Sequence, residues 1–160
     1  MQTVTVLCVG KLKERFYADA CAEYQKRLTR FCRLNLIELP EQRLPDDPSS
    51  AEIAAALERE ADAITEKLPR GGAVVALCIE GKELSSEQLA GALARYATQG
   101  VSQLTFLIGG SFGLAERVKQ AADLRLSMSP MTFPHHLARV MLLEQIYRAY
   151  QIQSGTKYHK

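Results

Sequence analysis

The run Gly-Gly-Ser-Phe-Gly at 109–113 is the first candidate for chemistry, because it directly follows the apolar run 104–108. Glycines at a strand end permit positive φ angles and let a ligand approach the backbone closely. In parallel α/β sheets, ligands bind outside the carboxyl ends of the strands. A helix expected from about Leu114 to Ala122 would direct its free amide groups to the same place. We interpret the run as a candidate ligand loop, and the alternative is a tight strand-to-helix turn.

The glycine spacing excludes two common nucleotide sites. The pattern G-G-x-x-G is not the dinucleotide fingerprint G-x-G-x-x-G, and the position about 20 residues on, where that site needs an acidic residue, is Ser129. A phosphate-binding P-loop needs Gly-Lys followed by Ser or Thr, whereas the two Gly-Lys pairs precede Leu12 and Glu83. Neither a nicotinamide-dependent dehydrogenase nor a P-loop ATPase is therefore expected.

A second candidate segment runs from Met128 to Phe133 and continues into Pro134, His135 and His136. Its prolines restrict the backbone path, and its apolar side chains could form one wall of a pocket for a flat heterocycle. The alternative is an ordinary connection between a strand and a helix. Adjacent histidines point about 100° apart on a helix, and the chain has no metal-ligand spacing such as H-E-x-x-H, so we expect no metal site.

The tail Lys157-Tyr158-His159-Lys160 places an aromatic ring and an imidazole between two cations. That combination suits a base turned out of an RNA strand, and the alternative is a frayed terminus. On the preceding helix, Glu144 and Arg148 are spaced i,i+4 and could form a surface ion pair. Burial in a subunit interface would explain why that helix carries so many apolar residues, namely Val140, Met141, Leu143, Ile146, Tyr147 and Tyr150.

Apolar strand patterns alternate with amphipathic helix patterns throughout the chain. This order predicts one α/β domain over residues 1–160, with a mostly parallel sheet flanked by helices. We expect strands at 3–9, 34–39, 73–79, 104–108 and 124–128. The first helix would bury one stripe of residues spaced four apart, from Phe16 through Ala20 and Tyr24 to Leu28. Capping-box pairs at Ser49–Glu52 and Ser85–Gln88 open two later helices.

Composition indicates a soluble cytoplasmic protein. Hydrophobic residues make up 47% of the chain and the net charge is only +2, so an RNA partner would have to meet a local basic patch or lie in a larger particle. The four cysteines form no C-x-x-C pair, and we interpret them as reduced core thiols. No apolar stretch approaches the roughly 20 residues that span a bilayer, so no membrane partner is expected.

Together these motifs resemble the RlmH family of SPOUT methyltransferases. The resemblance is carried by Ile-Gly-Gly-x-x-Gly at 108–113, Leu-Ser-x-Ser-x-Met-Thr-Phe-Pro-His at 126–135, Glu-Gln-x-Tyr-Arg-Ala at 144–149 and the terminal Tyr-His-Lys. The opening Val-Gly-Lys-Leu-Lys at 9–13 is similar as well, so the match spans the whole chain. Each element alone is common, whereas their combination and order are specific.

The resemblance implies a fold and a cofactor that spacing does not reveal. The fold would be an α/β-knot with a C-terminal trefoil knot that holds the cofactor, S-adenosyl-L-methionine, within roughly residues 73–160. The implied cofactor-binding residues are Leu77, Gly109, Gly110, Gly113, Met128, Ser129, Pro130, Met131, Thr132 and Phe133. The protein would be a homodimer in which the partner's tail completes each site.

The activity implied is methyl transfer to N3 of a pseudouridine in 23S ribosomal RNA on the assembled ribosome. His135 is our first candidate for the base that assists loss of the N3 proton, and the partner subunit's His159 is the second. Tyr158 would orient the base, while Arg139, Lys157 and Lys160 would hold RNA phosphates. The alternatives are a SPOUT enzyme for another RNA, such as transfer RNA, and a non-catalytic ribosome-associated protein. The sequence leaves open whether the N-terminal cations contact RNA.

Overall fold

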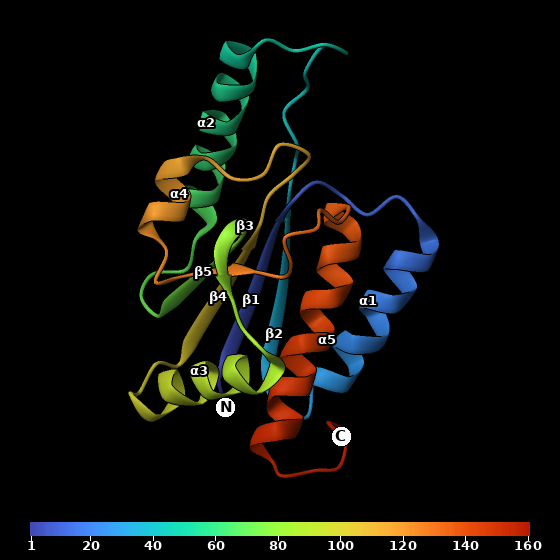
Figure 1. Ribbon diagram of the computed structural model, residues 1–160, viewed down its shortest axis with the longest axis vertical. Coiled ribbons are helices and arrows are strands. Elements are labelled where there is room, and N and C mark those ends of the chain that lie inside the picture. The colour runs from blue at the N-terminus through green and yellow to red at the C-terminus, as the bar shows by residue number, and fades with distance from the viewer.

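A computed structural model describes residues 1–160 and contains one five-stranded sheet in the order β2-β1-β4-β3-β5. All neighbouring strands run parallel. The predicted fold class, a parallel α/β sheet flanked by helices, is confirmed (Figure 1). The strands are β1 (Thr3–Val9), β2 (Arg33–Leu39), β3 (Ala73–Glu83), β4 (Gln103–Ile108) and β5 (Leu124–Ser127).

Helices cover both faces of the sheet and make three layers (Figure 1). One face is covered by α1 (Arg15–Leu28), α3 (Ser86–Thr98) and α5 (His135–Gln153), and the other by α2 (Ser50–Lys67) and α4 (Glu116–Ala121). Because strand side chains alternate between faces, β1 sends Val4, Val6 and Cys8 to the first layer and Leu7 and Val9 to the second. A strand packed on both faces is expected to be mostly apolar, and in β1 only Thr3 and Thr5 are polar.

The strand β3 is longer than the sequence predicts and is interrupted. Residues 75–77 pair with β5 from Leu124 to Leu126, after which the chain leaves the ladder and returns so that Lys82 also pairs with Leu126. The excursion is visible as the light green segment in front of the sheet (Figure 1). Gly81 permits the return, since a Cβ there would lie 2.8 Å from the backbone carbonyl of Arg125. We expected this strand to end at Ile79, but the excursion lies there and β3 continues beyond it.

Two helix predictions need correction. The helix after the glycine run begins at Glu116 rather than at Leu114, because Leu114 and Ala115 are buried against the α2 layer before the chain turns helical. In α1, Leu28 is fully buried but Phe16 is 66% exposed, so the predicted stripe is wrong at its first residue. Positions four apart drift by about 40° on a helix, which carries Phe16 about 120° away from Leu28.

The helix α5 lies between α1 and α3 against the sheet (Figure 1). Leu143, Ile146 and Tyr150 are buried within the chain, so the core accounts for half of the apolar residues that we assigned to a subunit interface. Val140 and Met141 stay partly exposed. No helix is both long and apolar enough to cross a membrane.

The predicted capping box at the start of α2 is present, and its contribution to stability can be tested. The Ser49 hydroxyl accepts a hydrogen bond from the Glu52 N–H, and the Glu52 carboxylate accepts one from the Ser49 N–H. We expect Ser49→Ala to lower the free energy of unfolding by about 1 kcal/mol in urea titrations. Ser50→Ala, one residue further and without a capping bond, is the control and should change it by less than about 0.5 kcal/mol. Equal losses would contradict the capping role.

Candidate functional site

A cavity of about 740 Å³ lies at the carboxyl ends of β3, β4 and β5. Its size is within the range of small-molecule sites, and its place is where parallel sheets bind ligands. Of the residues predicted to bind a cofactor, all but Pro130 line it. They are Leu77, Gly109, Gly110, Gly113, Met128, Ser129, Met131, Thr132 and Phe133.

The glycine run closes into a tight turn at one side of this cavity. The Gly113 N–H donates to the Gly110 carbonyl over 3.1 Å, and Gly113 has φ +80°, a conformation that favours glycine. A Cβ on Gly109 would lie 2.4 Å from the Gly113 backbone, so a side chain there requires the turn to move. These glycines bring backbone atoms to the cavity surface.

Glu41, in the loop after β2, is hydrogen-bonded to this turn. The sequence analysis did not predict this contact. Its Oε1 accepts a hydrogen bond from the Ser111 N–H over 2.7 Å. A Cβ on Gly110 would lie 2.6 Å from the same oxygen. Glu41 and Ser111 are 70 positions apart in the chain, and no local pattern connects them.

The excursion of β3 forms the opposite wall with Leu77, Cys78, Ile79 and Glu80. Glu80 forms an ion pair with Lys119 of α4, which also lines the cavity. This contact lowers the pKa of Glu80 and raises that of Lys119, so both stay charged at neutral pH. The sequence reasoning missed this pair because only the packing of α4 beside β3 brings the two residues together.

The third side of the cavity is the segment 128–133. It is held by its own side chains, because the Ser129 hydroxyl accepts from the Met131 N–H and the Ser127 hydroxyl donates to the Ser129 carbonyl. Met131 is left 72% exposed beside the cavity. The predicted wall of apolar side chains therefore exists, and serine contacts within the segment set its shape.

His135 lines the cavity at the first residue of α5. Its Nε2 is buried without a hydrogen-bond partner and faces Gly10, lying 3.4 Å from where a Cβ on that glycine would be. Burial lowers the pKa of His135, and the neighbouring His136 lowers it further. The ring is therefore neutral at pH 7, as a proton acceptor must be.

Arg139 is buried inside the chain, whereas we expected it to contact an RNA phosphate. Its side chain is 3% exposed, and it donates to Glu38 Oε2 over 2.7 Å and to the Gly10 carbonyl over 3.0 Å. The Arg139 hydrogen bond helps hold the pKa of Glu38 below its usual value, against the opposing effect of burial. With its guanidinium engaged in this way, Arg139 positions α5 against the ends of β1 and β2.

The C-terminal tail is packed rather than frayed. Tyr158 donates to Glu144 Oε1 over 3.1 Å and lies under the Arg148 guanidinium, whose carbon is 4.8 Å from the ring centre. His159 contacts Arg148 through Nδ1 and Glu87 through Nε2, over 3.1 and 2.7 Å. The Glu144–Arg148 pair is thus partly buried and anchors the tail.

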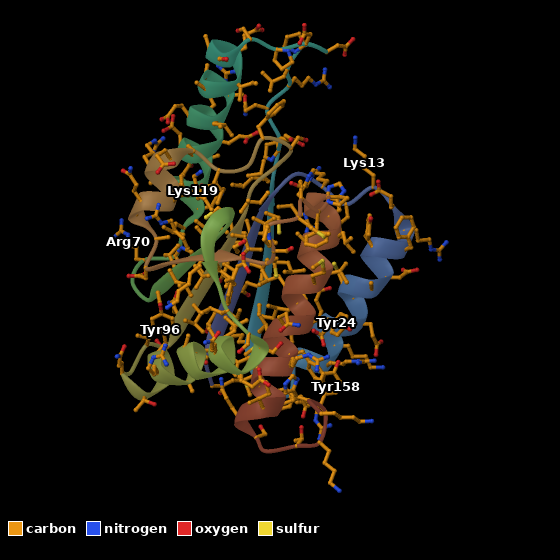
Figure 2. All side chains as sticks on the ribbon, viewed as in Figure 1. Lys13, Tyr24, Arg70, Tyr96, Lys119 and Tyr158 are labelled. Atoms are coloured by element: carbon orange, nitrogen blue, oxygen red, sulfur yellow. The ribbon has the colours of Figure 1, made fainter.

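The tail does not reach the cavity of its own chain. Tyr158 and His159 are absent from the cavity lining, and Lys157 and Lys160 are exposed. The tail packs on the C-terminal half of α5, whereas His135 begins that helix (Figures 1 and 2). Tyr158 reaches back to Glu144, nine residues after His135, so about 14 Å of helix lies between that contact and the residue that lines the cavity.

The cysteines do not present a thiolate. Burial raises the pKa of Cys8 to about 12 and that of Cys32 to about 11. Burial and the charge of Glu80 also raise the pKa of Cys78, which lines the cavity. Because the thiolate is the nucleophilic form, a covalent cysteine mechanism is disfavoured here.

Comparison with known proteins agrees with this geometry. The family model described as "Predicted SPOUT methyltransferase" matches residues 1–159. The chain is 47% identical over 157 residues to ribosomal RNA large subunit methyltransferase H of Streptococcus equi subsp. zooepidemicus, covering 98% of this chain and 99% of the relative. This chain belongs to the RlmH family of SPOUT methyltransferases. The protein of the same description from Bifidobacterium animalis subsp. lactis is 49% identical over 157 residues, with the same coverage of both chains.

Solved structures support the SPOUT fold at lower identity. The tRNA (m1G37) methyltransferase of Aquifex aeolicus aligns with a TM-score of 0.54 and 13% identity, over 92% of this chain and 69% of that one. A methylase-family protein of Haemophilus influenzae aligns with a TM-score of 0.53 and 10% identity, over 97% and 67% of the two chains. At such identities the likeness concerns the fold alone, and the RlmH assignment depends on the sequence relatives.

The buried Arg139 gives a stability prediction. We expect Arg139→Met to lower the free energy of unfolding by about 3 kcal/mol, because it removes a buried partner of Glu38 and leaves the Gly10 carbonyl without its donor. Arg27→Met is the matched control, since the Arg27–Glu23 pair is largely exposed and should contribute at most about 1 kcal/mol. Urea unfolding measures both, and equal effects would contradict the positioning role.

Proposed function

We propose that this member of the RlmH family transfers a methyl group from S-adenosyl-L-methionine to N3 of a pseudouridine in 23S ribosomal RNA, on assembled ribosomes in the cytoplasm. The observation that carries the proposal is the match along nearly the whole chain to proteins described as ribosomal RNA large subunit methyltransferase H. Two of the segments quoted for the resemblance, 108–113 and 126–135, line one cavity, which is the expected place for a cofactor. The single domain over 1–160 and the trefoil knot within 73–160 stay predictions.

The cavity fits a cofactor with an adenine ring and a charged amino-acid end. Its apolar walls are supplied by Leu77, Met128 and Phe133, and its backbone donors and acceptors by the glycine turn. Gly109 allows the turn to close, since a Cβ there would lie 2.4 Å from the Gly113 backbone. When bound, S-adenosyl-L-methionine supplies an electrophilic methyl group. The chain's task is then to hold the acceptor nitrogen in line with that group and to assist loss of its proton.

His135 is the proposed proton acceptor, and the structure narrows which atom could act. Its Nε2 is enclosed next to Gly10, whereas Nδ1 is not among the buried unpartnered atoms. The proposal therefore assigns the role to Nδ1. The lowered pKa of His135 keeps the ring neutral at neutral pH, and in the tautomer that carries its proton on Nε2, Nδ1 is free to accept.

A homodimer with the tail acting on the partner's site is the arrangement that we propose for Tyr158, His159, Lys157 and Lys160. Its support is that the tail is held on Glu144 and Arg148 and that none of its residues lines the cavity of the same chain. A second cavity of about 470 Å³ is lined by Val140 and Met141, which remain partly exposed, and it shares Leu126 and Met128 with the first. A partner subunit covering this groove would bring its tail near the first cavity.

The cofactor assignment is tested at the glycine turn. Gly109→Ala should abolish measurable binding of S-adenosyl-L-methionine in calorimetry, because the new Cβ would meet the Gly113 backbone at 2.4 Å. Gly91→Ala is the control: its Cβ would meet only the Arg95 side chain at 3.7 Å, in the middle of α3, and binding should be unchanged. Wild-type affinity in a folded Gly109→Ala protein would show that the cofactor binds elsewhere.

The substrate and the tail are tested together. Ribosomes lacking the modification, incubated with enzyme and labelled S-adenosyl-L-methionine, should gain one methyl group on the pseudouridine, located by mass spectrometry, while transfer RNA should gain none. Deleting Tyr158–Lys160 should preserve cofactor binding and abolish this transfer. Full activity of the truncated protein would refute the role of the tail.

Subunit mixing distinguishes a tail that acts on the partner from one that acts on its own chain. A mixed dimer of a Gly109→Ala subunit and a tail-deleted subunit contains one intact cavity and one intact tail on different chains. If the tail serves the partner's site, mixing two inactive proteins should restore transfer. No restoration in dimers confirmed to be mixed would favour action within one chain.

A further inference from the structure

The segment between β1 and α1 presents cations on one side only. Lys11, Lys13 and Arg15 are exposed, whereas the alternating residues Leu12 and Glu14 are turned inward. The Leu12 side chain packs against the main core, and its N–H donates to Glu38 Oε2 over 3.2 Å. Glu14 Oε2 lies 3.3 Å from His136 Nδ1. We call the outward residues Lys11, Lys13, Arg15 and the adjacent Phe16 the basic strip.

The basic strip is held beside the cofactor cavity. Gly10 is the residue before the strip. Its carbonyl accepts a hydrogen bond from the buried Arg139 guanidinium, and its backbone lies next to the His135 ring. His135 itself lines the cavity. Lys13 projects away from the body of the molecule on the side where α5 begins, far from Tyr158 and the tail (Figure 2). A strand lying along the strip would therefore meet the cavity at His135.

The cations of the strip are available for a partner. Lys11 and Lys13 form no ion pair, and the Arg15–Asp19 contact is long, at 3.8 Å, between two largely exposed side chains. Two carboxylates near the strip have other partners: Glu38 pairs with Arg139, and Glu41 accepts from the Ser111 N–H. Glu14 is turned inward, with Oε2 buried 3.3 Å from His136 Nδ1. No carboxylate therefore lies within ion-pair distance of Lys11 or Lys13, whose ammonium groups remain available to a partner.

Phe16 adds an aromatic surface to this charge. Its side chain is 66% exposed although it begins an amphipathic helix, and its ring centre lies 4.4 Å from that of Tyr17. The exposed ring lies next to three cations and offers a flat apolar face to a partner. Cations that track a backbone and aromatic rings that stack on bases are the combination used to bind single-stranded nucleic acid.

We propose that the basic strip binds the single-stranded RNA next to the target nucleotide, with Lys11, Lys13 and Arg15 on its phosphates and Phe16 stacked on a base. The inference rests on the proposed function and extends it, by naming a substrate contact on the cavity's own chain that the partner's tail does not supply. It also explains how a chain of net charge +2 engages RNA, because the charge is concentrated beside the cavity.

The charge component is tested by the double substitution Lys11→Gln/Lys13→Gln in the full-length protein. We expect kcat/KM for methylation of ribosomes lacking the modification to fall on the order of tenfold, and its dependence on salt concentration to become shallower. Calorimetric affinity for S-adenosyl-L-methionine should not change. Lys67→Gln/Arg70→Gln removes two exposed, unpaired cations just before β3 and should leave both quantities at the wild-type value.

The stacking component is tested at Phe16. Phe16→Ala should weaken ribosome binding, measured by sedimentation with 70S ribosomes, by about tenfold, because base–aromatic stacking is lost. Phe16→Tyr keeps a ring of the same size and should retain wild-type binding. Since Phe16 is exposed, both variants should unfold at wild-type urea concentrations.

Three outcomes would overturn the inference. Strip variants that methylate and bind ribosomes like the Lys67/Arg70 control would show that RNA does not contact this surface. Equal binding by Phe16→Ala and Phe16→Tyr would remove the stacking role. A change in oligomeric state on substitution, seen by sedimentation equilibrium, would show that a second copy of the chain covers the strip. Failure of the wild-type enzyme to methylate ribosomes would instead refute the proposed function.

Discussion

The buried contact of Arg139 with Glu38 and the Gly10 carbonyl is the interaction on which the arrangement of the site depends. It joins the first turns of α5 to the ends of β1 and β2, three elements far apart in the chain. A buried guanidinium is costly unless it is paired, and the two partners of Arg139 restrict α5 to one position along its own axis. Because His135 begins that helix, the same contact sets where its ring enters the cavity.

The cavity also depends on an irregularity in the sheet. Neighbouring parallel strands normally end at the same edge. Here β3 interrupts its pairing with β5 and rejoins it, so that Leu77 and Lys82 both pair with Leu126. The excursion raises one wall beside the glycine turn after β4. Close backbone approach at Gly81 and Gly109 makes this possible, and neither position accepts a Cβ without backbone movement. The two glycines are thus required by backbone packing around the cavity.

The helix α5 connects two chemically different ends of the molecule. Its beginning carries a neutral histidine beside the cavity and the exposed basic strip, while its last turns hold the tail through Glu144 and Arg148. The partly buried Glu144–Arg148 pair holds the tail, since Glu144 accepts from Tyr158 and Arg148 contacts His159. Held there, the tail does not line the cavity of its own chain, which is why the proposed mechanism uses two subunits.

Much of this protein could be read from local pattern. Periodicity located all five strands and the capped helices, since burial of one face and satisfaction of helix ends leave signals in neighbouring residues. The glycine run was assigned to a ligand site because ligands bind at strand ends in parallel sheets. The motif order indicated the family, and the resemblance to that family added the segment 128–133 to the same site. Contacts between distant segments left no such signal: Glu41 behind Ser111, Glu80 with Lys119, the burial of Arg139 and the exposure of Phe16. These depend on how elements pack and rotate against one another, so only the tertiary structure decided which charged and aromatic side chains are engaged and which remain free for a substrate.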